Sequence, residues 1–245
     1  MDEPGSRRER PAKEALTRRG IVAAAVDVMG AEGLGRVTMR RLAKELDTGP
    51  ASLYVYFRNT AQLHAAVLDE LLGAVDLSPV DAKGDWRDRL QAVLASYTLV
   101  LFEYPSLAQS AVSARPSGQN YLRLVESILT LLDEGDVPPR QASWGVDLLL
   151  QLATSTAAEH AGGDDPEEWN AVAAALRAVQ PETHPRIAAL GEDLLSGSGP
   201  DRTSWGVRAL INGVLATPRT EDGVLGTPRT ENGVLGTPRT EGERA

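Results

Sequence analysis

The side chains best suited to binding chemistry lie in two short stretches near the N-terminus. They are guanidinium groups and hydroxyls, which contact the phosphate oxygens and base edges of DNA. These residues are Thr38, Arg40, Arg41, Ser52, Tyr54 and Tyr56. An Arg at the start of a helix can reach a phosphate or a guanine, and the small Ala51 lets a backbone come close to DNA. The same Tyr-rich stretch can equally form a corner of the core, and its spacing does not separate the two interpretations.

The sequence contains few residues that could support catalysis. The chain has three His and no Cys, so disulfides, thiolate metal sites and cysteine nucleophiles are excluded. It has no neighbouring Ser, His and Asp and no glycine-rich phosphate loop. The acidic run 164–168 is a candidate cation site, but a solvated, proline-containing loop explains it better. We therefore predict no catalytic residue, no metal and no cofactor.

Charge divides the chain into a basic head and an acidic body. Residues 1–60 carry 11 Lys and Arg against 8 Asp and Glu, whereas residues 61–245 carry 14 against 26. Such a chain approaches a polyanion with one end only, because its body is repelled. The apolar residues are mostly Leu, Ala and Val, which favours an all-α fold. No apolar run nears the roughly 20 residues of a membrane span and no signal segment is visible, so we expect a cytoplasmic protein without membrane contact.

Periodicity divides the N-terminal part into an arm and a helical unit. Residues 1–16 are polar and carry four basic side chains, which predicts a flexible basic arm. A first helix begins at Thr17, Thr38 offers the N-cap of a short second helix, and turn residues at 47–50 separate it from a third. A helix, a tight turn and a second short helix braced by an earlier one form a helix-turn-helix. We assign residues 17–75 to this unit, with a fourth helix that has two apolar faces.

Residues 76–216 are predicted to form a larger helical domain. Long helical periods cover 86–104 and 119–135. The segments 140–160 and 202–215 are apolar around most of their circumference and must be covered on all sides. Shorter helices are expected over 169–179 and 185–195, with a break at 196–200.

The two apolar segments predict a homodimer. Large exposed apolar patches are uncommon on monomers, and two-fold self-association would cover both segments. A charge at Leu149 or Ile211 should then separate the subunits.

The C-terminal segment contains three copies of a decapeptide in register, which begin at Asn212, Asp222 and Asn232. Each copy has an Asn-Gly or Asp-Gly turn and a Thr-Pro break that prevents a continuous helix. Its Val-Leu pair is too little to bury, so we predict that residues 217–245 are disordered. The tetrapeptide Ser-Trp-Gly-Val also occurs twice, at 143–146 and 204–207, which we attribute to coincidence.

The N-terminal motifs resemble the DNA-binding domain of the tetracycline-repressor family. The resemblance covers residues 17–75 and rests on the runs that start at Ile21, Val37 and Ser52. It implies an N-terminal three-helix helix-turn-helix domain with a larger C-terminal helical domain. The positions that it places at operator contacts are Thr38, Arg40, Ser52, Tyr54 and Tyr56.

Three positions depart from the family pattern. Asp47 stands at a usual left-handed Gly, a conformation that Asp tolerates better than most residues. Thr60 replaces a usual Lys, which weakens one phosphate contact, and Val55 could meet a thymine methyl group.

The body resembles the family's C-terminal ligand-binding and dimerisation domain, which implies a cavity among the helices that start near Leu63, Trp86, Gln119 and Arg140. The family's tetracycline-binding Asn is replaced by Val93, so we expect a different ligand. Polar candidates for its contacts, each of which can also serve the core, are Tyr97, Tyr121, Gln151 and His160.

These features predict a sequence-specific transcriptional regulator and not an enzyme. The favoured function is a repressor that an unknown small-molecule inducer releases from double-stranded operator DNA. A DNA-binding regulator without a ligand is the first alternative, and ligand-dependent loss of operator binding distinguishes it. A helical protein-binding adaptor is the second, and it would lack sequence-specific DNA binding.

Overall fold

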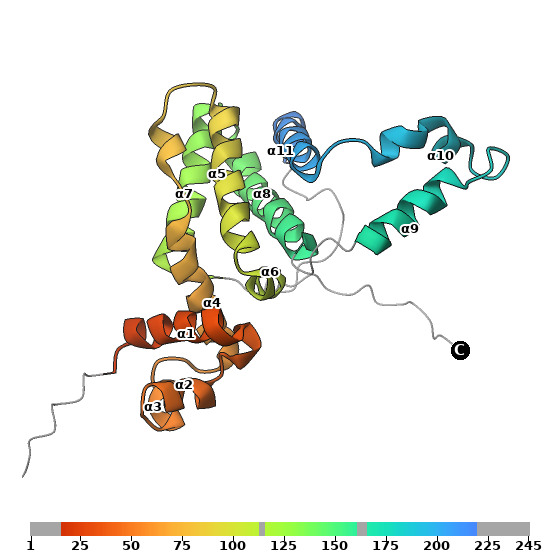
Figure 1. The fold of residues 1–245 in the computed structure, drawn as a ribbon. Coiled ribbons are helices and arrows are strands. Elements are labelled where there is room, and N and C mark those ends of the chain that lie inside the picture. Colours follow the sequence, from red (N-terminus) through yellow and green to blue (C-terminus); the bar gives the residue numbers. More distant parts are fainter. Residues whose placement is uncertain (1–15, 113–115, 161–165, 220–245) are drawn as a thin grey trace, which may run out of the picture.

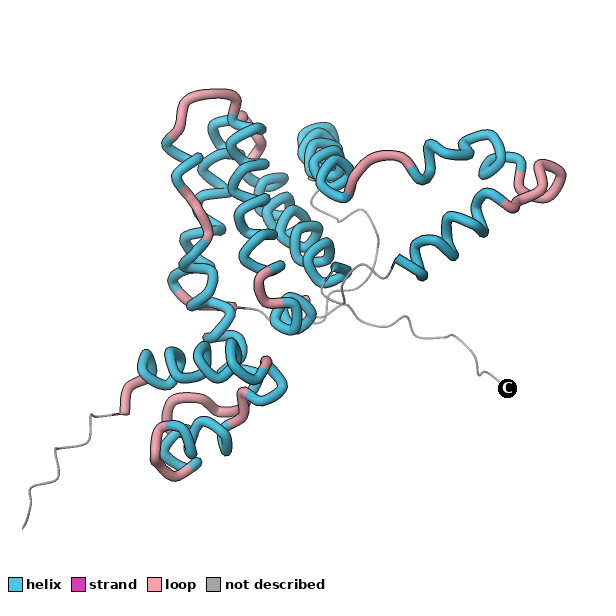
Figure 2. Tube along the Cα trace, in the orientation of Figure 1, coloured by secondary structure: helices cyan, strands magenta, loops and turns pink. Residues whose placement is uncertain are grey.

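The computed structural model describes residues 16–112, 116–160 and 166–219, and within them the chain is helical and has no strand. An N-terminal head joins a larger helical body, from which a short helical arm projects (Figures 1 and 2). The head helices are α1 (Arg18–Glu32), α2 (Met39–Glu45) and α3 (Pro50–Tyr54). The body helices are α4 (Thr60–Leu71), α5 (Trp86–Phe102), α6 (Pro105–Ala111), α7 (Gln119–Glu134), α8 (Pro139–His160) and α11 (Gly199–Ala216). The 3-10 turns η1 (Leu34–Arg36), η2 (Leu72–Ala74) and η3 (Ser78–Asp81) connect them.

Side-chain caps fix where α1, α2 and α4 begin. Thr17 accepts a hydrogen bond from the Gly20 N–H, and Thr38 accepts one from the Arg41 N–H. Asn59 accepts the N–H of Gln62 at the start of α4. Each cap satisfies a backbone donor that has no partner inside its helix.

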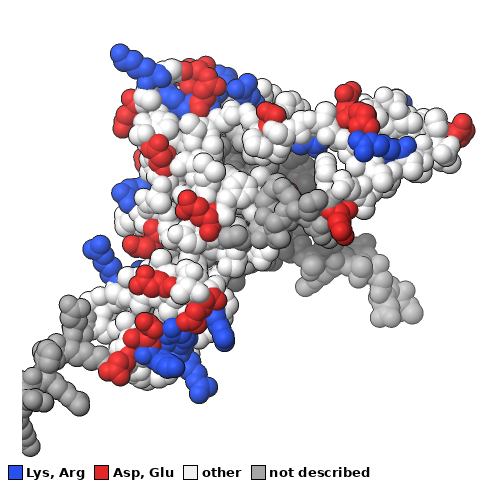
Figure 3. Space-filling model, viewed as in Figure 1, with Lys and Arg blue, Asp and Glu red and all other residues white. Residues whose placement is uncertain are grey.

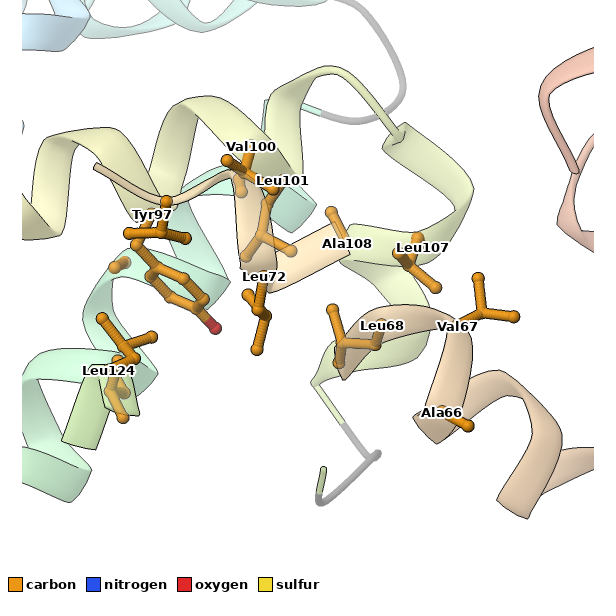
Figure 4. Close-up of a cluster of buried hydrophobic side chains, with 14 of the residues drawn as sticks. Ala66, Val67, Leu68, Leu72, Tyr97, Val100, Leu101, Leu107, Ala108 and Leu124 are labelled. Carbon is orange, nitrogen blue, oxygen red and sulfur yellow. The ribbon is translucent and has the colours of Figure 1, made fainter. Parts of the chain in front are cut away.

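Helix α4 belongs to the cores of both the head and the body. Leu63 and Val67 are fully buried, and α4 contacts α1 in the head and α6 and α7 in the body. Figure 4 shows Leu68 of α4 and Leu72 in one apolar cluster with Leu101 of α5 and residues of α6. The two apolar faces that the sequence predicts are therefore both used.

The arm consists of α9 (Pro166–Arg177), α10 (Pro185–Leu190) and the 3-10 turn η4 (Gly191–Leu195), and it projects from the body (Figure 1). These elements pack against one another, and Arg177 forms an ion pair with Glu192 at 2.7 Å. Arg202 of α11 donates to the carbonyls of Leu194 and Ser196, which fixes the arm's C-terminal end to the body.

Several expected boundaries differ from the structure. The sequence pattern predicts a helix as far as Phe57, but α3 ends at Tyr54 and the two following residues form a turn. Helix α11 begins at Gly199, inside the expected break, because Ser198 and Asp201 form a reciprocal capping box. Of the segment that the sequence predicts to be disordered, residues 217–219 are described, whereas residues 220–245, like residues 1–15 of the expected basic arm, lie outside the described residues.

Candidate DNA-binding surface and ligand cavity

The turn between α2 and α3 sets the geometry of the head. Asp47 has a φ of 46°, the left-handed conformation that the sequence comparison with the family suggested for this position. The Thr48 N–H closes the end of α2 by donating to the Ala43 carbonyl at 2.8 Å. Pro50 then starts α3, where its lack of an N–H costs no helical hydrogen bond.

The most exposed candidate contacts lie on one short stretch of this unit. Val55 is 80 % exposed and Tyr54 is 54 % exposed, although both are large apolar or aromatic residues. Leu53 before them and Phe57 after them are fully buried and anchor the stretch to the core. Arg40, on α2, is also exposed. The remaining candidates are Thr38, which is exposed, and Ser52 and Thr60, which are half-buried.

Arg41 is held by carboxylates of the head itself. Its guanidinium group donates to Glu32 of α1 at 2.6 Å and to Glu45 of α2 at 2.7 Å. The hydrogen bond from Arg41 keeps the pKa of the Glu32 carboxyl below its ordinary value, and the two carboxylates raise the pKa of Arg41. The sequence pattern placed Arg41 next to Arg40 but gave no sign of this bridge between α1 and α2.

Tyr56 also has an internal partner. Its hydroxyl donates to the Leu16 carbonyl at 2.5 Å and so connects the end of α3 to the chain that enters α1. On the same side, the Arg18 guanidinium lies 5.0 Å from the centre of the buried Phe57 ring. Arg18 was missed by the sequence reasoning, although its position one residue after the Thr17 cap places it at the start of α1.

Charge is gathered unevenly on the head. Figure 3 shows Lys and Arg at its lower end, the end where Figure 1 places α2 and α3, with Asp and Glu close by. This arrangement can bind phosphates at one end of an otherwise acidic protein.

A cavity of about 360 Å³ lies in the body, and three of the four predicted ligand contacts line it. They are Tyr97, Tyr121 and Gln151. The Tyr97 hydroxyl lies 2.7 Å from the Thr154 hydroxyl, and burial raises the pKa of the Tyr97 phenol. His160, the fourth candidate, is the last residue of α8, and its side chain lies outside the described residues.

Other polar residues of the cavity were not predicted. Asp147, Thr154 and Ser155 line it from α8, and Asp147 accepts a hydrogen bond from Gln151 at 2.6 Å. Together with Gln151 they follow the four-residue and three-residue spacing of one helix face. This polar stripe in an otherwise apolar helix is the sequence signal that could have found them. Helix α6 also contributes, through Ala111.

A second concavity, which we call the α8–α11 groove, is apolar and has a volume of about 520 Å³. The two helices approach closely where Gly145 meets Val214 and Gly206 meets Leu152, so they run antiparallel. Three large apolar side chains along the groove are exposed, namely Trp144, Leu148 and Trp205. The expectation that α8 is buried on all sides is therefore not met within one chain.

Within the described ranges, no group of three or more His, Asp or Glu could hold a metal ion, and no helix is long and apolar enough to cross a membrane. The acidic run 164–168 lies partly outside those ranges.

Known proteins share this combination of helix-turn-helix head and helical body. Residues 21–67 match the family "Bacterial regulatory proteins, tetR family", and residues 78–217 match "Tetracyclin repressor-like, C-terminal domain". The transcriptional repressor DrrR1 of Streptomyces coeruleorubidus is 31% identical over 86% of this chain and 81% of its own length.

Solved structures agree with these matches. A transcription regulator from Streptomyces coelicolor is 57% identical over 85% of this chain and 98% of its own, with a TM-score of 0.73. ActR from the same organism is 29% identical over 82% of this chain and 98% of its own, also with a TM-score of 0.73. ActR has been solved in complex with actinorhodin and with (S)-DNPA.

The fold and the head define a DNA-binding regulator with a separate helical body. The chain belongs to the tetracycline-repressor family of transcriptional regulators.

Proposed function

We propose that this regulator is a repressor that binds a two-fold operator as a homodimer and leaves it when a small molecule fills the body cavity. The observation that carries the proposal is the pairing, in one chain, of an exposed recognition stretch at Tyr54 and Val55 with a hydroxyl-lined cavity in the body. A DNA-binding protein acts where the chromosome lies, which supports a cytoplasmic location. Two observations support a protein without enzymatic activity. The family acts in transcription, and the sequence has few residues that could support catalysis.

In the DNA complex we assign base contacts to Arg40, Tyr54 and Val55. Arg40 can donate two hydrogen bonds to guanine, and Val55 can contact a thymine methyl group. The hydroxyls at positions 38, 52 and 60 are proposed to contact phosphates. Arg41 and Tyr56 serve by holding α2 and α3 in place, since their polar atoms are engaged inside the head.

Footprinting on the DNA that flanks the protein's own gene tests the operator proposal. A protected, two-fold symmetric site is expected, and Tyr54→Phe should weaken binding to it. Tyr104→Phe is the matched control, because Tyr104 follows α5 in the body. Absence of any protected site, with the protein folded, would favour the adaptor function instead.

The cavity lining supports a ligand rich in hydrogen-bonding groups. Hydroxyls of Tyr97, Thr154 and Ser155 and the carboxylate of Asp147 all reach the cavity. Buried Val93 occupies the family's tetracycline-binding Asn position and offers no hydrogen bond, so we propose that tetracycline is not the inducer. Actinorhodin, with which the related ActR has been solved, is a reasonable first probe.

Release of a labelled operator by added actinorhodin or tetracycline tests this ligand assignment. The expected result is release by the first and no release by the second. Ser155→Val should reduce the response through the loss of one hydroxyl, whereas Ser143→Val, on the same helix outside the cavity, should not. Operator binding that no small molecule changes would support the regulator without a ligand.

The α8–α11 groove supports the homodimer. A second copy placed on it would bury Trp144, Leu148 and Trp205, which a monomer leaves in water at a free-energy cost. A dimer with its two-fold axis through this face has two heads, one on each subunit. Two recognition stretches about one DNA turn apart, roughly 34–36 Å, would then match a palindromic site.

A further inference from the structure

The chain's own C-terminal segment covers one end of the α8–α11 groove. Thr217, Pro218 and Arg219 follow α11 and line the groove. The Arg219 guanidinium lies 3.9 Å from the centre of the Trp144 ring. It also donates to the Ser143 hydroxyl at 3.0 Å. A cation that lies over an indole face and also donates to a hydroxyl makes a specific contact, which distinguishes this segment from a chain end without defined partners.

The same Thr-Pro-Arg sequence recurs further along the chain. It stands at 217–219, 227–229 and 237–239, each time after a Val-Leu pair at the same spacing. In the first copy, Val214 of that pair packs on Gly145 in the groove. Each later copy therefore offers the same apolar pair and the same Arg that the first copy already uses on this face.

The groove has a second tryptophan in a matching stretch of sequence. Trp205 lies in a second Ser-Trp-Gly-Val sequence and is 74 % exposed. Because α8 and α11 are antiparallel, with Gly206 beside Leu152, Trp205 and Trp144 lie at opposite ends of the groove. The two ends are about 12 Å apart, since some eight helical residues separate them at 1.5 Å each. The ten residues from one repeat Arg to the next can extend over about 33 Å, which is more than the distance between the two ends of the groove.

We propose that the second repeat, residues 222–231, docks in the α8–α11 groove of its own chain, with Arg229 on Trp205. The tail then occupies the face that a second copy needs, so the repeats weaken dimerisation. The competition rests on the homodimer proposed above, whereas docking is a property of a chain whose groove no second copy covers. The third repeat, 232–241, has the same residues and can replace the second.

Tethering makes such docking effective even if each contact is weak. A tether of about ten residues gives an effective local concentration on the order of millimolar. A segment that binds with a millimolar dissociation constant is therefore docked for a large part of the time. A second copy at micromolar concentration has to displace it, which weakens the apparent dimer affinity by several-fold.

Fluorescence quenching in the full chain tests the docking. The chain has no Cys, so Asn232→Cys provides a single site for a nitroxide label. Docking brings the label to the tryptophans of the groove and lowers their emission. The disrupting variant changes Val224, Leu225, Val234 and Leu235 to Ser, and its matched control changes Thr230 and Thr240 to Ser. We expect the disrupting variant alone to recover the emission. Equal emission in all three proteins, or quenching that disappears on dilution, would overturn docking within one chain.

Sedimentation equilibrium of the same unlabelled variants tests the competition. The disrupting variant is expected to dimerise several-fold more tightly than the native chain, and the control should match the native chain. An unchanged dissociation constant would overturn the competition. If every variant is a monomer, the proposed dimer fails, while the quenching experiment still decides whether the tail docks.

Discussion

The carboxylate of Asp69 accepts a hydrogen bond of 2.9 Å from the backbone N–H of Tyr121, so the helix that leaves the head is bonded to a wall of the cavity. Asn120 adds a second bond by donating to the Asp69 carbonyl at 2.7 Å. Gly118 precedes α7 and has no side chain to cap it, and a methyl group there would overlap the Asp69 carboxylate. Asp69 thus supplies from α4 the N-terminal cap that α7 lacks. A ligand that moves Tyr121 would also move α4.

Replacing Asp69 tests this connection. Asp69→Ala should lower the free energy of unfolding by about 1 kcal/mol, the usual effect of losing an N-terminal cap. Asp69→Asn should lose less, because its amide oxygen can still accept the Tyr121 N–H. Urea unfolding of the three proteins measures the difference. Equal loss in Ala and Asn variants would show that charge, and not the hydrogen bond, matters at this position.

The Asp69 contact also shows where prediction from sequence ends. Caps at Thr17, Thr38 and Asn59 could be anticipated because each acts on a residue three positions ahead. Asp69 caps a helix 52 residues away, and only the packing of α4 against α7 brings the two together. Local pattern therefore predicted the order of the helices well, whereas contacts between helices required the structure.

The head gives a similar result at the level of single side chains. The residue types and their spacing selected the exposed Tyr54, whereas Val55 was named only through the family resemblance. The same spacing could not distinguish Arg40 from Arg41, whose guanidinium groups have different surroundings. Glu45, four residues after Arg41, and Glu32, on another helix, both pair with Arg41 and distinguish it from Arg40. The contact with Glu32 could be found only from the structure.

Arg40 and Arg41 should therefore respond differently to substitution. Arg40→Ala is expected to weaken specific operator binding by roughly 1–3 kcal/mol if the side chain reads a base edge. Binding to unrelated DNA should fall much less. Gel-shift titrations on both DNAs measure the ratio. Equal weakening on operator and unrelated DNA would reassign Arg40 to a phosphate contact.

The pair between Glu32 and Arg41 should make the head sensitive to acid. Arg41 lowers the pKa of Glu32 in the folded protein, so the contribution of the pair is present above the carboxyl's unfolded pKa and is lost as the pH falls through the lowered folded value. Arg41→Ala should therefore lower the melting temperature near neutral pH. At a pH below the folded pKa of Glu32, the native and variant proteins should melt alike. Thermal melts over this range decide the matter, and a difference independent of pH would refute an electrostatic role.

The dimer face can be tested with three leucines in distinct environments. Leu148 is 44 % exposed and lines the α8–α11 groove, whereas its neighbour Leu149 is fully buried inside the chain. Sequence alone selected Leu149 and Ile211 as interface positions, but both are buried in the core of one subunit, so a charge there should unfold the protein. The apolar pattern of the helix did not reveal which of its faces meets its own chain.

Leu148→Asp is instead expected to give folded monomers that bind the operator weakly, because one head alone contacts half of a palindromic site. Leu99→Asp is the matched control, since Leu99 is 62 % exposed on α5 and does not line the groove. This variant should remain dimeric, whereas Leu149→Asp should lose its cooperative melt. Sedimentation equilibrium, circular dichroism and gel shifts follow these three properties separately. A Leu148→Asp protein that stays dimeric would exclude the α8–α11 groove as the dimer face, because a buried and unpaired carboxylate could not be accommodated there.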